Sequence, residues 1–330
     1  MQYPFRVNVA PFTNKAAMLG TTFPSDKEKP MPHWLTGILT CLLILLNTLI
    51  GIGPMLLIAL LKVAIPHRGF RAWCSRQVMW IAETWAEINK GIFRLMLPTV
   101  WDIRCDVPLN PDHSYLVISN HQSWVDIPAL VQSFNRKTPY FKFFLKKELI
   151  WVPFIGLAFW ALDYPFMKRY SKAHLARRPE DRGKDLEITR YACAKFRDLP
   201  VTVVNFLEGT RFTRQKHQAQ GSPYCHLLRP KSGGIAFVTA ALGEQMRSLL
   251  DVTIVYPSPE PPGFWALVSG RVPRVVVDIQ AQTLAPELFH GNYSEDPQFR
   301  EYFQSWVNQL WARKDERIAE LKRTLGQKIS

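Results

Sequence analysis

The sequence predicts an α/β protein in which a mixed, mostly parallel sheet is covered by helices and preceded by a membrane-embedded helical segment. Short runs rich in valine and isoleucine alternate with helical patterns from residue 115 onward. Strands that alternate with helices are typical of parallel sheets whose connections pass over the sheet faces. Ahead of them, residues 34–61 carry no charged side chain, which predicts the membrane segment.

Length and composition limit the classes of protein. A chain of 330 residues can bury a full core, as one large domain or two small ones. Its 47% hydrophobic content excludes an intrinsically disordered chain. The net charge of +14 predicts anionic partners such as phospholipid headgroups, nucleic acid or phosphorylated cofactors. The five cysteines form no C-x-x-C pair, so neither a disulfide framework nor a zinc site is indicated.

The N-terminal part divides into an arm and an apolar segment. Residues 1–33 are polar and contain several prolines, and we expect them to form a flexible arm. Residues 34–65 contain the uncharged run, which as a helix would be roughly 42 Å long, more than the roughly 30 Å of a bilayer's hydrocarbon core. Gly53 and Pro54 interrupt this run, so a kinked transmembrane span and a re-entrant hairpin of two half-helices both stay open. The flanking basic residues weakly favour a cytoplasmic position for the rest of the chain.

Residues 66–105 alternate tryptophans with basic side chains, for example Trp73, Arg76 and Trp80. This alternation predicts an amphipathic helical region in the membrane interface. The alternative is an ordinary surface helix that packs on the following domain. Residues 106–330 are expected to form that α/β domain and to end in an amphipathic helix, residues 297–325, that packs as a lid.

The elements of the α/β domain are predicted from its periodicity. We expect strands over 115–119, 201–207, 251–256 and 273–279, and helices over 127–135, 184–198 and 233–247. The polar residues that follow two of these strands are the first candidates for chemistry, because α/β proteins build their sites where strands end.

His121 and Asp126 follow the first of these strands, in the stretch N-H-Q-S-W-V-D that starts at Asn120. A histidine in this position can act as a general base while a carboxylate holds its other ring nitrogen. In the structural alternative, Asp126 caps the helix that begins at Ile127, and His121 is a hydrogen-bonded histidine at the rim of the sheet. The spacing, the strand-end position and a second motif favour the catalytic interpretation.

That second motif, Glu208-Gly209-Thr210-Arg211, follows the second strand. Glycine allows a ligand to approach the backbone, threonine offers a hydroxyl, and the arginine guanidinium suits phosphate oxygens. Two basic segments accompany it, Phe166-Met167-Lys168-Arg169 and Arg229-Pro230-Lys231-Ser232-Gly233-Gly234. The second of them stands at a predicted helix start, where free N–H groups attract anions. Together with a base, these segments predict transfer chemistry on a phosphate-bearing substrate.

In this order, the patterns H-x4-D, F-x-x-R, F-x-E-G-T-R and P-K-S-G-G resemble the motifs of the glycerophospholipid acyltransferase family, which includes the 1-acylglycerol-3-phosphate acyltransferases. The resemblance covers residues 115–260, and within the family the chain is similar to a bacterial inner-membrane branch. It implies the glycerolipid acyltransferase fold, an O-acyltransferase activity, and a position in the inner membrane with the domain on the cytoplasmic side.

The resemblance also implies a role for each motif residue. His121 would be the catalytic base and Asp126 its orienting partner. The substrate phosphate would be bound by residues of the second and third motifs, namely Arg169, Glu208, Gly209, Thr210 and Arg211. Supporting roles would fall to Asn120, Phe166, Lys168, Pro230 and Lys231. Pro257 is an alternative to Pro230 for the fourth motif.

The expected substrates are a lysophospholipid, foremost 1-acyl-sn-glycerol-3-phosphate, and an acyl thioester of CoA or acyl carrier protein as co-substrate. No cofactor and no metal are expected. An anionic membrane surface is an expected partner and nucleic acid is not, because no RRM, KH, zinc-finger or helix-turn-helix signature occurs. The alternatives are a transacylase, an acyltransferase for another lysophospholipid, and a basic membrane-bound adaptor.

Overall fold

The computed structural model describes residues 31–143, 145–152, 154–164, 166–167, 177, 193 and 200–327. The chain divides into two units, Met1–Pro32 and His33–Ser330, and the following description concerns the second. The predicted arm lies outside the described residues as far as residue 30. The same is true of the predicted helix 184–198, apart from Cys193.

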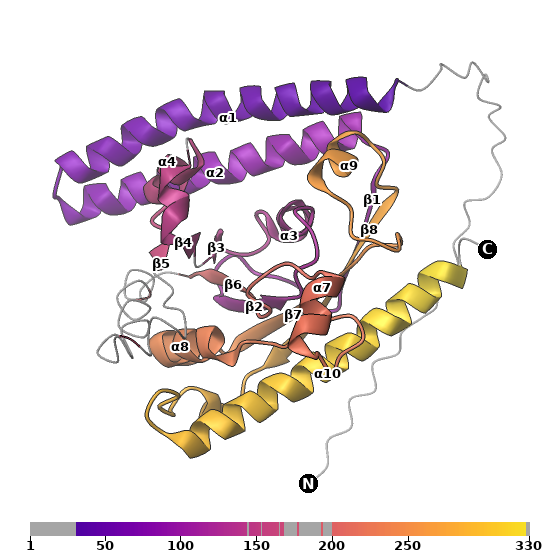
Figure 1. Cartoon of the computed structure of the whole chain (residues 1–330). Helices are drawn as coiled ribbons and strands as arrows, with labels where there is room; N and C mark the ends of the chain where they lie inside the picture. Colours follow the sequence, from indigo (N-terminus) through magenta and orange to yellow (C-terminus); the bar gives the residue numbers. More distant parts are fainter. Residues whose placement is uncertain are drawn as a thin grey trace, which may run out of the picture. The chain divides into compact units, whose positions relative to one another are not determined.

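A six-stranded sheet forms the centre of the described structure (Figure 1), with the strand order β1-β8-β7-β2-β6-β3. The strands are β1 (Val100–Cys105), β2 (Tyr115–Ser119), β3 (Phe141–Phe143), β6 (Thr202–Phe206), β7 (Ser248–Val255) and β8 (Arg274–Thr283). Every neighbouring pair is parallel except β7 and β8, which are antiparallel. The prediction of a mixed, mostly parallel sheet is therefore confirmed.

The four predicted strands are present, and two strands of the six-stranded sheet, β1 and β3, were missed. β3 is only three residues long, too short for a periodicity to show. β1 lies within residues 66–105, which the sequence assigned to an interfacial helical region, and the helix there ends earlier, at Met96. β1 is an edge strand with a mixed polar and apolar sequence, so it lacks the valine-rich run that marks the buried strands.

Helices and a small second sheet surround the central sheet. They are α1 (His33–Ala64), α2 (Arg68–Met96), α3 (Asp126–Phe134), α4 (Ile155–Ala161), α7 (Arg214–Gln220), α8 (Ser232–Leu242), α9 (Phe264–Val268) and α10 (Pro297–Gln327). Short 3₁₀ turns cover Lys147–Trp151, Gly243–Met246 and Pro286–Leu288, and β4 (Leu145–Lys146) pairs with β5 (Phe166–Met167).

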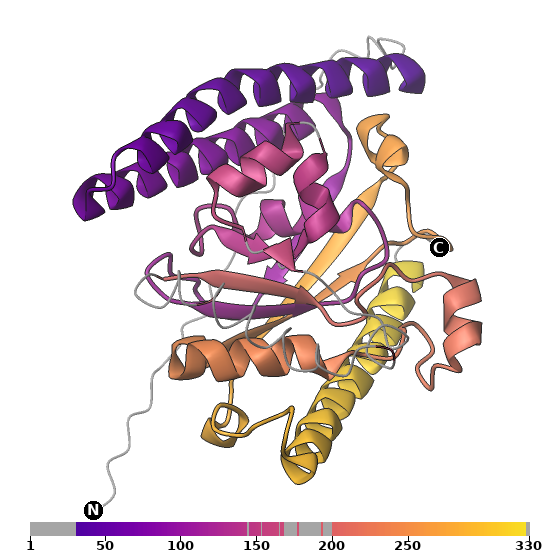
Figure 2. The ribbon, with the colours of Figure 1, turned by 60° about the vertical axis from the view of Figure 1, so that its left-hand side comes forward.

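The helices α1 and α2 lie side by side along one side of the sheet (Figures 1 and 2). α1 runs through Pro54 without a break, so the chain does not reverse at Gly53-Pro54 as the half-helix hairpin requires. Instead it turns after Ala64 and returns as α2. The amide of Asn47 donates to Asn89 Oδ1 (2.9 Å) and links the two helices.

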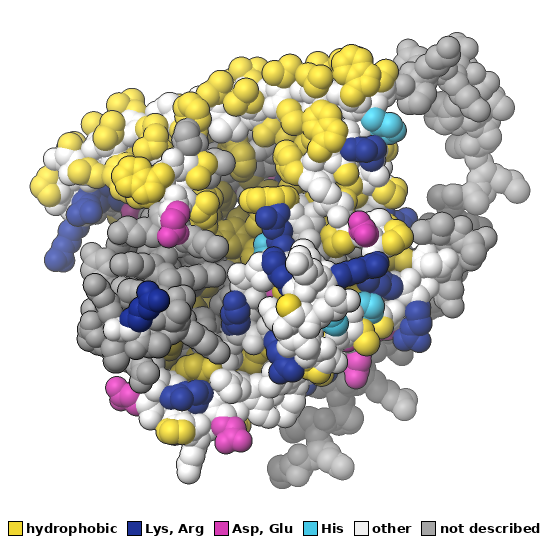
Figure 3. Space-filling model, in the orientation of Figure 1, with side chains coloured by type: hydrophobic (Ala, Val, Ile, Leu, Met, Phe, Trp, Pro, Cys, Tyr) yellow, Lys and Arg dark blue, Asp and Glu magenta, His cyan; other side chains and the backbone are white. Residues whose placement is uncertain are grey.

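The outward side of α1 is strongly apolar. Its exposed large hydrophobic residues form the band at the top of Figure 3, and they are Trp34, Ile38, Leu39, Leu42, Leu43, Leu45, Leu46, Leu49, Ile50, Leu57, Leu60, Leu61 and Val63. Within the described residues, α1 is the one helix long and apolar enough to cross a membrane. Only 11% of its apolar window is buried, so α1 differs from the core helix of a soluble protein. α1 is therefore a candidate membrane helix.

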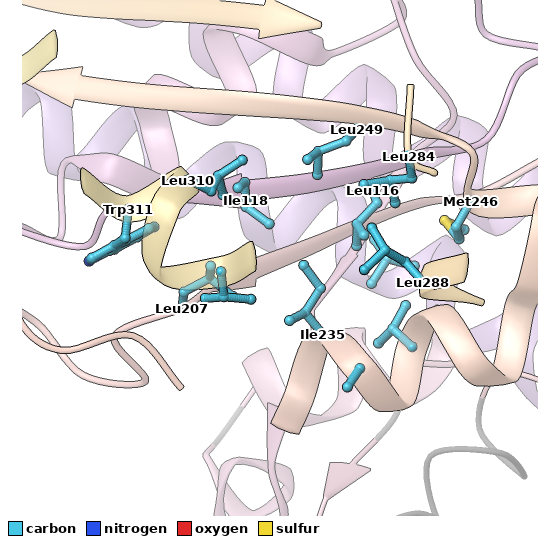
Figure 4. Packing of buried hydrophobic residues seen from close by; sticks show 14 of the residues in the cluster. Leu116, Ile118, Leu207, Ile235, Met246, Leu249, Leu284, Leu288, Leu310 and Trp311 are labelled. Carbon is cyan, nitrogen blue, oxygen red and sulfur yellow. The ribbon is translucent and has the colours of Figure 1, made fainter. Parts of the chain in front are cut away.

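The core consists of two layers, one on each face of the sheet. Side chains alternate along a strand, so Leu116 and Ile118 of β2 enter one layer while Val117 enters the other. The first layer includes residues of α8 and α10, and Figure 4 shows Leu310 and Trp311 packed beneath the strands. The second layer includes residues of α2, α3 and α9. Burial on both faces explains why the central strands read as unbroken apolar runs.

The C-terminal helix α10 is a covering layer and not the lid that its amphipathic pattern suggested. Phe303 and Trp311 are fully buried in the core beneath the sheet. Lys314 is also buried, and its ammonium group donates to the carbonyl oxygen of Val252 (2.6 Å). The apolar face of α10 thus packs against the sheet, and Figure 2 shows the helix lying along one side of the sheet.

Candidate active site

The two polar motifs meet at the carboxyl ends of β2 and β6. These strands are parallel neighbours, so the turns that follow them lie at the same edge of the sheet. The backbone N–H of His121 donates to Glu208 Oε1 (2.8 Å), and the N–H of Phe212 donates to the carbonyl oxygen of His121 (2.7 Å). Tertiary structure therefore brings together residues that are more than eighty positions apart in sequence.

Asp126 holds the turn that contains His121. Its Oδ2 atom lies 2.8 Å from His121 Nδ1 and accepts the backbone N–H groups of Gln122 (2.7 Å) and Ser123 (2.9 Å). Both of these donors precede α3, and the N-cap of α3 is Val125, which makes no side-chain capping bond. The alternative role of Asp126 as a helix cap is therefore wrong. Its carboxylate orders the turn and contacts the imidazole.

The geometry fixes the tautomer of His121. Asp126 Oδ2 already accepts two backbone N–H groups, so it acts as an acceptor toward Nδ1 as well, and Nδ1 carries the proton. The lone pair then lies on Nε2, to which no described residue donates. The ring stacks on Phe206 with 4.1 Å between centroids, and 18% of the side chain is exposed. Within the described residues the arrangement leaves Nε2 able to accept a proton, as a general base requires.

Ile254 of β7 and Tyr256, which follows β7, also contact the turn that contains His121. The side-chain amide of Asn120 donates to the carbonyl oxygen of Ile254 and accepts the N–H of the same residue, both at 2.9 Å. The hydroxyl of Tyr256 donates to Asp126 Oδ1 at 2.5 Å. Sequence reasoning missed Tyr256, although the predicted strand 251–256 ends on it immediately before Pro257.

Basic side chains gather beside the second motif. The guanidinium of Arg211 lies over the indole ring of Trp124, 4.3 Å from its centroid, and a guanidinium stacked on an aromatic ring can still donate N–H groups from its edge. Lys216, which the sequence analysis did not single out, donates to Thr210 Oγ1 (2.8 Å) and to the carbonyl oxygen of Arg211 (3.0 Å). Figure 3 shows dark-blue Lys and Arg side chains gathered beneath the apolar band.

Gly209 and Lys231 are also close neighbours. Gly209 has φ +66°, a conformation that favours glycine, and a β-carbon there would lie 3.2 Å from Lys231 Nζ. The backbone N–H of Lys231 donates to the carbonyl oxygen of Leu207 (2.7 Å), and α8 begins at the next residue, Ser232. The P-K-S-G-G segment therefore lies beside the E-G-T-R motif. It brings Lys231 and the start of α8 to the same edge of the sheet.

Not every predicted residue can be placed. Lys168 and Arg169 lie outside the described residues, and Phe166 is described only as backbone in β5. Pro230 precedes Lys231 and α8, whereas Pro257 follows Tyr256 at the end of β7, so both proline candidates for the fourth motif border the site. Among the described side chains no group of three histidine, cysteine or acidic residues is placed to hold a metal.

Glu208 is a buried acid beneath the site. Its carboxylate accepts the backbone N–H groups of His121 and Leu228. Burial raises the pKa of Glu208 to about 7 from an ordinary value of 4.5, the charge of Asp126 acts in the same direction, and the two backbone donors act against it. The carboxylate therefore links the loops after β2 and β6 and carries a proton at mildly acid pH.

The raised pKa of Glu208 predicts a loss of stability as the pH rises. Between pH 4.5 and about 7 the folded chain binds this proton and the unfolded chain releases it, so the contribution of Glu208 to the free energy of unfolding falls by about 3 kcal/mol across that window and is level above it. Glu208→Gln should remove this slope, at a constant cost because Leu228 N–H loses its acceptor. Unfolding midpoints measured from pH 4.5 to 8 test this, with the exposed Glu244→Gln as control. Parallel curves for wild type and Glu208→Gln would contradict it.

Comparison with known proteins agrees with this chemistry. Residues 100–256 match the family model of the acyltransferases. Residues 100–256 are an acyltransferase domain. A lysocardiolipin acyltransferase 1 from Danio rerio is 24% identical over 89% of this chain and 73% of its own length. A 1-acyl-sn-glycerol-3-phosphate acyltransferase delta from Bos taurus is 24% identical over 88% of this chain and 75% of its own length.

A solved structure is also similar to the acyltransferase chain. It is the 1-acyl-sn-glycerophosphate (LPA) acyltransferase PlsC from Thermotoga maritima, with 18% identity and a TM-score of 0.46 over 85% of this chain and 98% of the other. The family assignment rests on the sequence comparisons. They confirm the resemblance to the acyltransferase family and identify the chain as an O-acyltransferase. The similarity to a bacterial inner-membrane branch stays a prediction.

Proposed function

We propose that this acyltransferase moves a fatty acyl chain from acyl-CoA or acyl-ACP to the free hydroxyl of a lysophospholipid. The foremost acceptor is 1-acyl-sn-glycerol-3-phosphate, which gives phosphatidic acid. One observation carries the proposal: His121, whose Nε2 accepts no hydrogen bond from a described residue, lies at the same sheet edge as the guanidinium of Arg211. The names of the relatives, which act on lysophospholipids, support the same acceptor class.

The proposed reaction proceeds by direct transfer. His121 Nε2 takes the proton of the acceptor hydroxyl while the oxygen attacks the thioester carbonyl carbon. The new C–O bond forms, the C–S bond breaks, and the thiolate leaves with the proton returned by the imidazolium. Asp126 stabilises the imidazolium through Nδ1. No protein nucleophile is needed, in agreement with the absence of a G-x-S-x-G elbow from the sequence.

The acceptor phosphate is proposed to bind beside Arg211. Thr210, Lys231 and the backbone at Gly209 lie next to it, so several N–H and O–H donors converge there. Fixing the phosphate would hold the acceptor hydroxyl near His121 and lower the barrier by proximity. The roles of Arg169, Phe166 and Lys168 in phosphate binding rest on the family motif alone. No cofactor or metal enters the proposed reaction.

Membrane attachment is proposed to involve α1. The helix is joined to the domain at its first residue, where His33 Nδ1 lies 2.8 Å from the carbonyl oxygen of Ser269, and near its end, where Lys62 pairs with Asp163. Its exposed side is apolar along its length. This supports a chain seated on a membrane with an anionic surface, and the family resemblance suggests the cytoplasmic side of a bacterial inner membrane. Flotation with anionic vesicles that persists at high ionic strength tests the apolar contribution.

An assay of the purified chain tests the proposed activity. With lysophosphatidic acid and oleoyl-CoA in mixed micelles, we expect phosphatidic acid to form and CoA thiol to be released in equal amounts. Oleoyl-ACP in place of oleoyl-CoA identifies the carrier, and a labelled phospholipid as donor tests the transacylase alternative. A rate no higher than that of His121→Ala would exclude this substrate pair.

A second acceptor is suggested by the relatives. The Danio rerio protein is named a lysocardiolipin acyltransferase, and lysocardiolipin also presents a phosphate near a free hydroxyl. The two acceptors differ in headgroup size. Comparing kcat/KM for lysophosphatidic acid and lysocardiolipin in the same assay therefore decides which lysophospholipid the enzyme prefers.

A further inference from the structure

The side chain of Asp126 has two oxygens with different environments. Oδ2 contacts His121 Nδ1 and the two backbone N–H groups of the turn. Oδ1 accepts a single described hydrogen bond, from the hydroxyl of Tyr256 at 2.5 Å. Both Asp126 and Tyr256 are buried. A short hydrogen bond to a buried carboxylate is charge-assisted and directional, so it restrains rotation of the carboxylate about its Cβ–Cγ bond.

Tyr256 itself stands on a rigid element. It follows β7, which is mostly buried and is paired with β2 and β8 on either side. Two residues earlier, Ile254 holds Asn120 through both its N–H and its carbonyl oxygen. The end of β7 therefore fixes the start of the His121 turn through Asn120 and its end through Asp126. The turn is clamped at both ends to the same strand.

We propose that Tyr256 is a positioning residue for the transfer reaction. Through its hydrogen bond to Asp126 it keeps the His121 imidazole oriented toward the acceptor hydroxyl. This inference rests on the proposed roles of His121 and Asp126. The hydroxyl of Tyr256 reaches the turn through Asp126 Oδ1, so we expect its effect in the rate of the chemical step and not in substrate binding.

The test is Tyr256→Phe, which keeps the ring and removes the hydroxyl. We expect kcat to fall about 10-fold, with KM for both substrates within about two-fold of wild type. Tyr115→Phe is the matched control, because Tyr115 is a second buried tyrosine, its hydroxyl accepts one hydrogen bond from Asn110 N–H, and it lies at the opposite end of β2. That variant should keep the wild-type kcat.

A double variant separates positioning from a general structural effect. If the hydroxyl acts through the carboxylate, Tyr256→Phe should lower kcat less than about two-fold in an Asp126→Asn background, because the two changes are then non-additive. An unchanged kcat in the single variant would overturn the inference, and so would an equal loss in both backgrounds. A wild-type kcat in Asp126→Asn alone would instead overturn the proposed roles of His121 and Asp126. Unfolding midpoints confirm that each variant is folded.

Discussion

We expect the His121→Ala enzyme to turn over about 10²–10⁴-fold more slowly than wild type, the range that general-base catalysis contributes. The reason is the tautomer that Asp126 imposes, because it leaves the lone pair of the imidazole on Nε2. Steady-state assay of kcat with saturating acceptor and thioester measures the loss. Binding to vesicles should be unchanged, because α1 carries the apolar surface.

His113→Ala is the matched control for this prediction. His113 is exposed in the loop that precedes β2, so it lies at the amino end of the strand whose carboxyl end leads to His121. Its variant should keep wild-type kcat. Because His121 also stacks on Phe206, the unfolding midpoint of His121→Ala is measured in parallel. Normal turnover by a folded His121→Ala enzyme would contradict the assignment of the base.

Arg211→Ala is expected to lower kcat/KM for a phosphate-bearing acceptor by about 10- to 100-fold, mainly through a higher KM. Charge-assisted hydrogen bonds contribute about 1.5–3 kcal/mol, which corresponds to this range. The guanidinium stacks on Trp124 and makes no ion pair within the described part of the chain, so its loss should cost binding energy and not the fold. Initial rates over a range of lysophosphatidic acid concentrations separate KM from kcat.

Arg214→Ala controls for the loss of one positive charge. Arg214 is exposed at the start of α7, three residues beyond Arg211, and its removal should leave KM within about two-fold because exposed charges are screened by solvent and salt. A neutral acceptor, monoacylglycerol, gives a second comparison. Equal losses with lysophosphatidic acid and monoacylglycerol would show that Arg211 does not bind the phosphate.

Local sequence patterns predicted much of the sheet and the chemistry. The central strands are buried on both faces, so their unbroken valine and isoleucine runs reveal them without any tertiary information. The edge strands β1 and β3 carry no such run and were missed. The amphipathic tail was recognised as a helix, but its pattern says only that one face is apolar and not what covers that face. Packing on the sheet made it a core layer.

The sequence by itself determined that a histidine, an aspartate and an E-G-T-R motif follow strand ends, and it thereby determined the candidate base and anion site. Only the tertiary structure decided how these groups meet, because the parallel pairing of β2 with β6 sets His121 beside Glu208. It also decided which nitrogen of His121 carries the lone pair, since that depends on three hydrogen bonds to one oxygen of Asp126. The contact between Tyr256 and Asp126 also depends on tertiary structure. It is set by the pairing of β2 with β7, two segments far apart in sequence, and no local pattern predicts it.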